Sequence, residues 1–501
     1  MPVSRDQDEI VAFLGDPRSY GAGIDRVDRH DTHISHVFLA GDRAYKLKRA
    51  VRFPYLDFST PRRRRLACEA ELSLNRRTAP ELYLEVRGIG RTREGRIGWT
   101  TRKGALDWVV VMRRFGQDQL LDALARAGSV DERLLLDLVA HIAAFHAQAE
   151  TRRDFGGSTT MAALIEANEA SLRHAGIFPK AEIAALHARS RDALDAVSDL
   201  LDARREAGKV RRCHGDLHLR NIAVIDGQPI LFDCIEFSER IATIDVLYDL
   251  AFLLMDLLHR GLGPFANLVA NRYLDLTDED AGLPALPLFL SVRAAIRAHV
   301  AVSQGGADDE ARAYLALARS LLAPAPPRLI AIGGLSGTGK STIARAVAPA
   351  LGAAPGARVL RSDVIRKRLC GAAPETPLPG EAYGPEMTAR VYRTLCDKAL
   401  GALRAGFCAV VDAVALRPEE RGAFAAVAAT AGVPFAGIWL QAPAATMAAR
   451  IRARRGDASD ATEEVLSQQL SRDPGDLAWQ RVDVGGDRAA SIAAVRQFLA
   501  P

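Results

Sequence analysis

The sequence predicts an α+β domain followed by an α/β domain. Strand-like alternation of apolar and polar residues fills the region before Gln117, and long amphipathic helical patterns follow it. After residue 328, strands and helices alternate regularly, which favours a parallel sheet covered by helices on both faces. The proline-rich stretch APAPP separates the two patterns and indicates a short, stiff linker. We therefore expect domains at 1–322 and 328–501, joined by a linker at 323–327.

The composition favours a soluble globular protein over a disordered one, with 49% hydrophobic and 25% charged residues. The net charge of +5 suits anionic small ligands as well as nucleic acid and selects neither. Six cysteines lack CxxC pairs and zinc-ligand spacing, which indicates reduced thiols. The charged first residues argue against a signal peptide, and the most apolar stretch, 246–258, carries two aspartates and is too short to span a bilayer. We expect a cytoplasmic protein that does not bind a membrane.

The first domain is expected to contain a small sheet-rich lobe followed by a larger helical lobe. One helical pattern, at 62–77, is inserted among the strands. After Gln117 the helices are interrupted only by HGDLHLRNIAVIDGQPILFDCIEF (214–237), where two short strands flank an Asp-Gly turn. The expected strands of the sheet-rich lobe are 33–41, 44–48, 82–90, 96–101 and 108–115.

The second domain opens with a strand and then a phosphate-binding loop. The stretch GGLSGTGKST (333–342) fits G-x-x-x-x-G-K-[ST], directly after an apolar strand and before a helical pattern. In such a loop the backbone N–H groups turn toward a phosphate, the lysine reaches the outer phosphates and the serine offers an oxygen to Mg²⁺. We expect this loop to bind ATP. Its predicted nucleotide-binding residues are Gly334, Ser336, Gly337, Thr338, Gly339, Lys340, Ser341 and Thr342.

Further strands of the second domain are expected at 357–363, 407–413 and 434–442, with helices between them and only helices from there to the end. Asp412, at the end of one strand, is the candidate Mg²⁺ ligand beside Ser341. Asp363 ends another strand and could bind the acceptor or activate its hydroxyl. The alternative for both aspartates is a helix N-cap. Arg450 and Arg454, expected on one helical face, are the candidates to close over the transferred phosphate.

The second domain resembles the small-molecule P-loop kinases, the group that includes gluconate kinase and the nucleoside monophosphate kinases. The resemblance rests on residues 334–341, on Asp363 with Arg366, on Asp412 and on the basic segment near 450, and it covers about the last 170 residues. It implies a P-loop fold that uses ATP and Mg²⁺. The stretch 378–395 has no signature that names the acceptor.

The loop HGDLHLRNI (214–222) carries the chemistry predicted for the first domain. Asn221 lies five positions after Asp216, and Asp233 lies twelve positions after Asn221. This is the order of a protein-kinase catalytic centre, in which an acid accepts or orients the acceptor hydroxyl proton, and an amide and a second acid bind Mg²⁺. We therefore expect Asp216 to be catalytic, and Asn221 and Asp233 to be metal ligands.

Such a centre also needs a lysine on the third strand of the sheet-rich lobe. Lys46 is the candidate, with Lys48 on the same strand face as the fallback. Glu71, in the following helix, is expected to pair with this lysine, and Glu69 is the competitor. The segment 109–115, including Met112, lies where a hinge between the lobes would contact adenine.

From about residue 30 to residue 300 the first domain resembles the aminoglycoside phosphotransferase family, through HGDLHLRN, LFDCIEF and IDVLYDLAFLLMDL. The resemblance implies a two-lobed kinase-like fold that phosphorylates hydroxyls of small molecules. It assigns Asp216 as the catalytic aspartate, with Asn221 and Asp233 as metal ligands. One departure is that the loop before the lysine, THISHVFLAGD, is poor in glycine, so phosphate cradling would have to come from Ser35 and His36 or be weaker. An inactive kinase-like domain is the alternative.

The arrangement of both domains resembles bacterial bifunctional aminoglycoside phosphotransferase-like and ATP-binding proteins. Both domains could be kinases that phosphorylate small-molecule hydroxyls, or one could be catalytic and the other regulatory, or the second domain could act on a nucleic-acid end. Nucleic acid is disfavoured because the aromatic residues of the second domain fall in predicted strands and core faces. The sequence does not predict the acceptor. Acids 236, 239, 245 and 249 suit a polycation, whereas Arg293 and Arg297 suit an anionic or neutral compound. It does not predict the oligomeric state either.

Overall fold

The computed structural model describes residues 5–53, 56–100, 104–303, 305, 308–454 and 456–500. Contacts divide the chain into two compact units. The front unit comprises residues 1–183, 198–256 and 296–312, and the rear unit comprises 184–197, 257–295 and 313–501. The rear unit thus includes segments that precede the linker expected at 323–327. The expected domain boundary stays a prediction.

The front unit contains a six-stranded antiparallel sheet in the order β1-β2-β3-β8-β6-β7. Five strands agree with the expected ones, although Thr101, at the end of one expected strand, lies outside the described residues. β1 was not expected, because its sequence VDRHD has no apolar alternation. The strands are β1 (Val27–Asp31), β2 (Ser35–Ala40), β3 (Arg43–Lys48), β6 (Tyr83–Arg91), β7 (Ile97–Thr100) and β8 (Ala105–Arg113), with a separate small hairpin of β4 (Arg52–Phe53) and β5 (Leu56–Asp57).

Each face of this sheet buries an apolar cluster under a helix. On one face, Ile10 and Leu14 of α1 (Arg5–Gly15) pack against Phe38 and Leu47. On the other face lies α2 (Pro61–Asn75), which begins where the Thr60 hydroxyl accepts the Arg63 N–H and Pro61 occupies the first turn. The alternation of the strands therefore sends every second residue of β3 toward α2.

The helical part of the front sequence is interrupted by a short hairpin, as expected. The hairpin turns at Asp226 and Gly227, whose φ values of 54° and 76° match the left-handed turn that an Asp-Gly pair favours. The elements from residue 117 to 320, with η marking 3-10 helices, are η2 (Gln117–Gln119), α3 (Leu121–Arg126), α4 (Glu132–Gln148), α5 (Gly157–Ala175), α6 (Lys180–Glu206), β9 (Val210–Arg212), η3 (Leu219–Asn221), β10 (Ile222–Ile225), β11 (Gln228–Leu231), α7 (Glu239–Ala242), β12 (Thr243–Asp245), α8 (Val246–His259), α9 (Gly263–Thr277), η4 (Glu279–Ala285), α10 (Leu286–Ser303) and α11 (Asp308–Ser320).

The rear unit contains a five-stranded parallel sheet in the order β14-β15-β13-β16-β17. The last strand, β17, corrects the expectation of helices alone at the end: it presents only Val482 to the core, so its sequence carries no alternation. The elements are β13 (Leu329–Gly333), α12 (Lys340–Val347), η5 (Ala348–Ala350), β14 (Arg358–Arg361), α13 (Ser362–Leu369), η6 (Gly380–Tyr383), α14 (Pro385–Arg404), β15 (Ala409–Asp412), α15 (Pro418–Ala431), β16 (Phe435–Gln441), α16 (Ala444–Ala453), α17 (Glu463–Leu470), β17 (Gln480–Asp483) and α18 (Arg488–Leu499).

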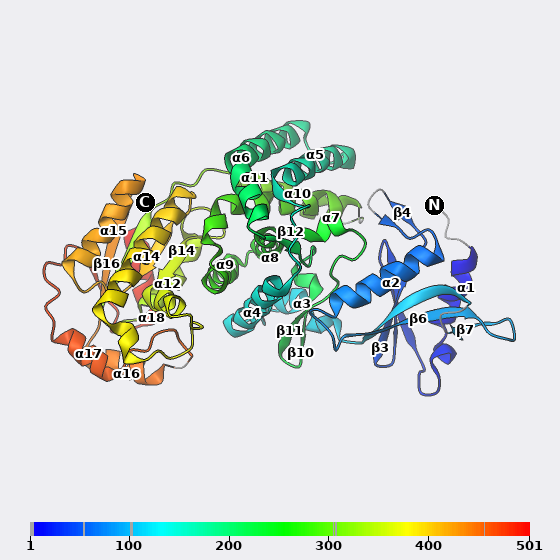
Figure 1. The fold of residues 1–501 in the computed structure, drawn as a ribbon, viewed down its shortest axis with the longest axis horizontal. Coiled ribbons are helices and arrows are strands. Elements are labelled where there is room, and N and C mark those ends of the chain that lie inside the picture. The colour runs from blue at the N-terminus through cyan, green and yellow to red at the C-terminus, as the bar shows by residue number, and fades with distance from the viewer. Residues whose placement is uncertain are drawn as a thin grey trace. The chain divides into compact units, whose positions relative to one another are not determined.

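Helices cover both faces of the rear sheet, as the alternating pattern predicts. α12 and α18 pack on one face, where Ile343 and Val495 join Ile332 and Val410 in one apolar cluster. α14 and α15 contact the sheet as well and pack against each other (Figure 1). Because parallel strands share a direction, the carboxyl ends of β13, β14 and β15 meet at one edge.

A helix from the middle of the sequence covers the edge strand β14 of the rear sheet. The Asn271 side chain accepts the Val359 N–H at 2.7 Å, and the side chains of Asn267 and Asn271 donate to the Ala357 carbonyl at 3.0 and 3.1 Å. These contacts satisfy backbone groups that an exposed edge strand would leave unpaired. Residues 263–277 are therefore part of the rear unit although they lie more than 50 residues upstream of β13.

Arg358 stabilises the β14 edge of the rear sheet by ion pairs. Its buried guanidinium lies 2.7 Å from both Asp275 and Asp280, and Lys398 lies 2.6 Å from Asp280. A buried cation of this kind is stabilising only while its acids remain beside it.

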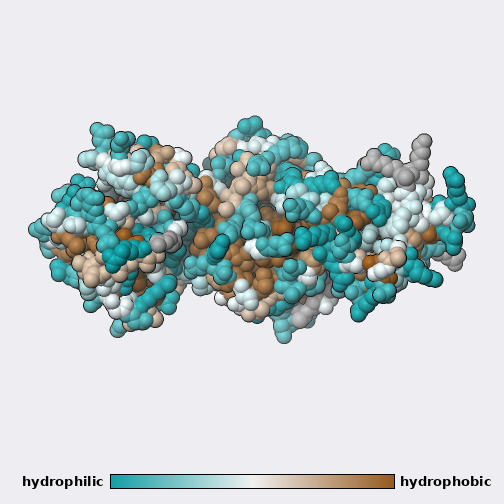
Figure 2. Space-filling view, turned by 90° about the horizontal axis from the view of Figure 1, so that it is seen from below, coloured by the Kyte–Doolittle hydropathy of each residue, from teal (hydrophilic) through white to brown (hydrophobic). Residues whose placement is uncertain are grey.

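One helical stretch, Glu279–Ser303, is long and apolar enough to cross a membrane, but 67% of its apolar window is buried inside the protein, as in a core helix. On the face drawn in Figure 2, hydrophilic residues predominate around smaller hydrophobic patches.

Arg358→Met is expected to destabilise the rear unit by about 3–5 kcal/mol, because Asp275 and Asp280 lose a buried partner. Scanning calorimetry should show a transition lowered by about 10 °C. The control is Arg452→Met, which breaks a pair with Glu463 whose side chains are 60% and 48% exposed, and it should shift the transition by about 2 °C or less. Equal shifts for the two variants would contradict the role of Arg358.

Candidate active sites

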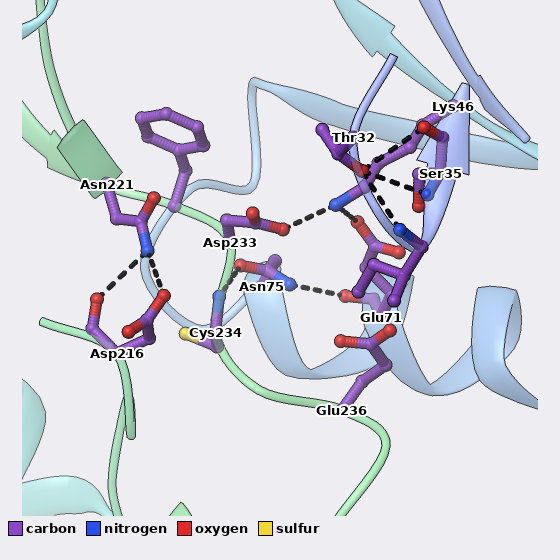
Figure 3. Close-up of polar contacts among 12 residues, drawn as sticks. Thr32, Ser35, Lys46, Glu71, Asn75, Asp216, Asn221, Asp233, Cys234 and Glu236 are labelled. Atoms are coloured by element: carbon purple, nitrogen blue, oxygen red, sulfur yellow. Dashed lines mark hydrogen bonds and ion pairs between the residues drawn. The ribbon is translucent and has the colours of Figure 1, made fainter. Parts of the chain in front are cut away.

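Lys46 lies at the centre of the front site. Its Nζ is 2.8 Å from Glu71 Oε1 and 2.5 Å from Asp233 Oδ1 (Figure 3). Burial opposes the charge of Lys46, but Asp233 and Glu71 outweigh it and hold the pKa of the ammonium well above its usual value. The structure thus brings together the three residues that the sequence selected from β3, α2 and the loop after β11.

The two competing candidates have different surroundings. Glu69 pairs with Arg65, four residues earlier on α2, at 3.1 Å. Lys48, the fallback lysine, is fully buried and also contacts Glu71, through Oε2. Sequence spacing placed both lysines on one face but could not show that they share one carboxylate.

The loop of residues 214–221 is held by acids from α8. The Asp249 carboxylate accepts the backbone N–H groups of His214 and Gly215 at 3.1 and 2.8 Å, and Asp256 accepts that of Leu219 at 3.0 Å. Gly215, at φ 86°, lies so close to Ala242 that a side chain would crowd it. α8 therefore fixes the backbone that carries Asp216 and Asn221.

Asp216 and Asn221 contact each other directly. Asn221 Nδ2 donates to the Asp216 carboxylate at 2.8 Å and to its carbonyl at 2.9 Å. His218 Nε2 lies 3.3 Å from the same carboxylate. Burial alone would raise the pKa of Asp216, but His218, His214 and Arg297 outweigh burial and hold it far below its usual value. Asp216 is therefore an ionised carboxylate and a weak base.

The loop after β11 is anchored residue by residue. Asp233 has φ 63°, a left-handed conformation that is strained for a side chain other than glycine, and its N–H donates to the Tyr83 hydroxyl at 3.1 Å. The Cys234 N–H donates to Asn75 Oδ1 at 2.7 Å, and the Ile235 N–H donates to the His214 carbonyl at 3.0 Å. These contacts join the loop to β6, to α2 and to the 214–221 loop.

The glycine-poor turn between β1 and β2 is closed by its own side chains. The Thr32 hydroxyl accepts the Ser35 N–H at 2.9 Å, and Arg49 donates to the Thr32 carbonyl at 2.8 Å. His36 pairs with Asp31 at 2.8 Å. The Ser35 N–H, expected as a phosphate donor, is thus engaged within the turn. Met112 lies on β8, within the expected strand 108–115, and is buried in an apolar cluster with Leu39 and Ala44.

In the rear unit, the phosphate-binding loop connects β13 to α12, as expected. Gly334 and Gly337 have φ values of 138° and 84°, and a Cβ on either would come within 2.7 Å of a backbone oxygen, of Leu440 or of Met447. Only glycine fits these two positions. The Thr338 hydroxyl closes the turn on the Leu335 carbonyl at 2.8 Å. Gly339 is the N-cap of α12, whose first residues are Lys340, Ser341 and Thr342.

The charged groups of the rear site have partners within the rear unit. Ser341 Oγ donates to Asp412 Oδ2 at 2.5 Å, and Lys340 Nζ donates to the Leu335 carbonyl at 3.1 Å. Burial lowers the pKa of Lys340 and outweighs Asp412 and Asp363. Arg361, at the end of β14, was not singled out from the sequence and lies 3.4 Å from Asp412 and 2.5 Å from Asp457.

A cavity of about 1200 Å³ joins these groups to the other candidates. Asp363, in the first turn of α13, lines it, and burial raises the pKa of its carboxyl. Arg450 and Arg454 line it as well, but they do not share a helical face, because α16 ends at Ala453. Arg450 donates to the Val484 carbonyl at 2.7 Å and Arg454 to the Ser459 carbonyl at 3.4 Å.

Gln469 of α17 is a contact that sequence reasoning missed. Its Oε1 accepts the Ser336 N–H at 2.8 Å, and Gln469 also lines the cavity. A carbonyl oxygen at this place stands where a phosphate oxygen would bind the loop. No motif links a glutamine 133 positions downstream to the loop, so the contact could be found only from the fold.

The sequence matches two family models. Residues 37–286 match the phosphotransferase enzyme family, and residues 329–473 match an AAA domain. Uncharacterized proteins of Mycobacterium tuberculosis (strain ATCC 25618 / H37Rv) and Mycobacterium bovis (strain ATCC BAA-935 / AF2122/97) are each 32% identical over 492 residues, which cover 93% of this chain and 94% of each relative. The chain belongs to the phosphotransferase enzyme family. In this chain, the phosphotransferase domain is followed by a P-loop kinase-like domain.

Solved structures of kinases are similar to parts of this chain. A gluconokinase from Sinorhizobium meliloti 1021 is 23% identical, with a TM-score of 0.24 and coverage of 35% of this chain and 97% of that one. An aminoglycoside phosphotransferase in ternary complex with ADP and hygromycin B is 15% identical, with a TM-score of 0.37 and coverage of 64% and 98%. A choline/ethanolamine kinase family protein from Mesorhizobium loti is 15% identical, with a TM-score of 0.35 and coverage of 63% and 95%. The kinase-like and P-loop folds expected from the sequence are confirmed by the two family matches and the two sheets.

Acidic pH is expected to lower the stability of the phosphotransferase domain around Glu71. Burial disfavours its charge, but Lys46 and Lys48 outweigh burial and lower the pKa of Glu71 to about 2 from 4.5. A lowered pKa stabilises the fold above pH 4.5, and this stability is lost as the pH falls toward about 2. Burial raises the pKa of Glu236. A raised pKa of a carboxyl group alters the stability of the fold only above its ordinary pKa of 4.5, so Glu236 does not contribute to the change between pH 4.5 and pH 2.

Hydrogen exchange of β3 and α2, corrected for the intrinsic rate at each pH, should show protection that falls from pH 4.5 to pH 2.5 in the unaltered protein. The loss should be on the order of 2–3 kcal/mol. In Glu71→Gln the same segments should be less protected at pH 6 and show a smaller fall. An equal fall in both proteins would show that Glu71 does not carry this pH dependence.

Proposed function

We propose that the chain carries two ATP- and Mg²⁺-dependent kinase sites, each of which transfers a phosphoryl group to a hydroxyl of a small molecule. The observation that supports this most strongly is that each unit gathers its own lysine and its own carboxylate for a metal ion. Lys46 and Asp233 meet in the front unit, and Lys340 and Asp412 line one cavity in the rear unit. Two such sites suit two nucleotides, because Lys46 and Asp233 both belong to the front unit and Lys340 and Asp412 both belong to the rear unit.

The front residues fit a magnesium ion. Asn221 uses its Nδ2 for Asp216, so its carbonyl oxygen is the atom that would face a cation, together with the Asp233 carboxylate. Oxygen ligands of this kind are those that Mg²⁺ prefers. The ion would supply charge neutralisation for the nucleotide phosphates. Lys46 would then donate to phosphate oxygens in place of Asp233, while Glu71 keeps it directed toward the site.

Asp216 is proposed to orient the acceptor. The acceptor oxygen would form a bond to the γ-phosphorus while the bond from that phosphorus to the bridging oxygen breaks, with ADP as the leaving group. Asp216 would orient the hydroxyl through a hydrogen bond, and the proton would pass to solvent as the new bond is completed. The strongly lowered pKa of Asp216 makes it a weak proton acceptor. Of the two roles expected for this residue, orientation is therefore the one that we propose.

In the rear unit, the loop amides and Lys340 would hold the nucleotide phosphates, and Ser341 with Asp412 would hold the magnesium ion. The Ser341 hydroxyl already points to Asp412 at 2.5 Å, so one ion could contact both oxygens. Asp363 would accept the acceptor proton, because its raised pKa makes it a better base than an ordinary aspartate. Arg450 and Arg454 would face the transferred phosphoryl group from the cavity wall.

The front site is proposed to take a neutral or anionic acceptor rather than a polycation. Three of the acids that could have bound a polycation already have other partners. Asp245 pairs with Arg204 at 2.7 Å, and Glu236 pairs with Lys48. Asp249 accepts backbone N–H groups of the 214–221 loop. Glu239 lies 3.5 Å from Arg152, with its side chain 62% exposed. A polycationic aminoglycoside would therefore lack three of these four partners.

The alternatives have weaker support. Nucleic-acid ends are disfavoured as acceptors because Phe407, Phe424 and Trp439 are buried, and buried rings cannot stack on bases. A purely regulatory rear unit is the remaining alternative, and Gln469 on the Ser336 amide is consistent with it. We also infer a cytoplasmic location, since no two of the six cysteines are joined.

Asp216→Ala is expected to lower front-site phosphoryl transfer by about 10²- to 10⁴-fold, because the acceptor hydroxyl loses its orienting carboxylate. The measurement is a screen of metabolite mixtures with labelled ATP and Mg²⁺, comparing products of the unaltered protein and the variant. Asp226→Asn, in the exposed hairpin turn, is the matched control and should keep full activity. Unchanged transfer in Asp216→Ala would refute the front-site mechanism.

Lys340→Ala should remove a different set of products from the same screen, because it deletes the cation that faces the rear phosphates. Products lost in both single variants would indicate one coupled reaction. If Lys340→Ala left every product unchanged, the rear unit would not be a kinase under these conditions, and the regulatory alternative would be favoured.

A further inference from the structure

Lys48 and Glu236 form a second ion pair behind Lys46. Lys48 is two residues after Lys46 on β3, so both side chains point from the same face of the strand. Lys48 contacts Glu71 Oε2 on one side and Glu236 Oε1 on the other, and its side chain is 0% exposed. The Phe58 ring lies 5.3 Å from the same ammonium. Figure 3 shows Glu236 on the loop that also carries Asp233.

This pair joins the two elements that the front site depends on. Glu71 lies on α2, and Glu236 lies three residues after Asp233. Lys48 therefore links α2 to the end of the loop whose beginning is Asp233. With the Tyr83, Asn75 and His214 contacts already described, every residue from 233 to 236 is anchored.

The charges explain why one lysine would not be enough. The cluster holds two ammonium groups and three carboxylates, those of Glu71, Asp233 and Glu236. When Lys46 turns from Asp233 to a nucleotide phosphate, its ammonium is shared between Glu71 and the phosphate. An α2 carboxylate held only by Lys46 would then be free to rotate, and Asp233 would lose its one fixed cation. Lys48 would retain Glu71 and the 233–236 loop during this exchange, because its side chain is 0% exposed and already lies between Glu71 and Glu236.

We propose that Lys48 and Glu236 are positioning residues, which hold Glu71 and the Asp233 loop in place while Lys46 exchanges Asp233 for a nucleotide phosphate. This inference rests on the proposed front kinase site. It distinguishes this chain from a kinase centre that relies on a single lysine–glutamate pair. A merely structural pair would stabilise the fold without affecting how the site responds to Mg²⁺.

The test follows the front site alone in the full chain. Hydrogen exchange of peptides covering 214–237 is measured while a non-hydrolysable ATP analogue is titrated, once with Mg²⁺ and once with EDTA. Lys48→Met and Glu236→Ala should weaken the Mg²⁺-dependent apparent affinity by about 10- to 100-fold, the usual cost of losing a group that orients a metal ligand. Affinity in EDTA should fall less than affinity in Mg²⁺, because it depends on Lys46 but not on the metal ligand Asp233. Glu236→Gln, which keeps an acceptor for Lys48, should show a smaller loss.

The control is Arg64→Met, on the same helix. Arg64 forms another buried pair, with Asp107 at 2.8 Å, that does not touch the Asp233 loop. It should lower thermal stability and leave the Mg²⁺-dependent affinity unchanged. If Lys48→Met fails to fold, Glu236→Ala and Glu236→Gln decide the question.

Two negative outcomes are distinguishable. If Lys48→Met and Glu236→Ala respond to Mg²⁺ like Arg64→Met, the pair is only structural, and the inference is wrong while the proposed function stands. If the unaltered protein shows no Mg²⁺-dependent protection of 214–237, the proposed front kinase site falls, and the inference falls with it.

Discussion

The partly buried ammonium of Lys46, shared between Glu71 and Asp233, is the contact on which the front site depends. A charge that loses most of its water is tolerated only beside opposite charges, so this lysine brings a strand, a helix and a loop to one point. Each partner comes from a different part of the sequence, and each is fixed by further contacts. Tyr83 and Asn75 hold the loop, and Asp249 holds the neighbouring loop with Asp216 and Asn221.

The rear unit also holds its charged groups beside internal partners, but it uses different contacts. Its loop presents backbone amides rather than a buried ion pair, and glycines at positions 334 and 337 let the backbone approach its neighbours closely. Ser341 and Asp412 contact each other, Arg361 lies beside that acid, and Gln469 occupies one amide. In both units, groups suited to a nucleotide and a metal ion are held by internal partners. Ligand binding in either unit would exchange partners rather than uncover bare charges.

Those parts of the fold and of the two sites that depend on short stretches of sequence could be predicted. The loop at 333–342, the Asp-Gly hairpin and the spacing of Asp216, Asn221 and Asp233 depend on short stretches whose residue types are restricted. Lys46 and Glu71 were selected from the order of parts in a protein-kinase centre, although the sequence left Lys48 and Glu69 as competitors. By contrast, β17, the Lys48–Glu236 pair and Gln469 depend on contacts between distant segments. α9 on the edge of the rear sheet is another case, since no periodicity indicates which strand edge a helix will cover. The expected face shared by Arg450 and Arg454 was wrong because the helix ends between them.

The number of nucleotides bound per chain tests the account most directly. Equilibrium titration of the unaltered protein with a non-hydrolysable ATP analogue and Mg²⁺ should give two bound nucleotides per chain. Asp233→Asn and Lys340→Ala should each reduce the number to one, and the double variant should bind none. A single nucleotide per chain in the unaltered protein, or a stoichiometry that neither substitution changes, would contradict two independent sites.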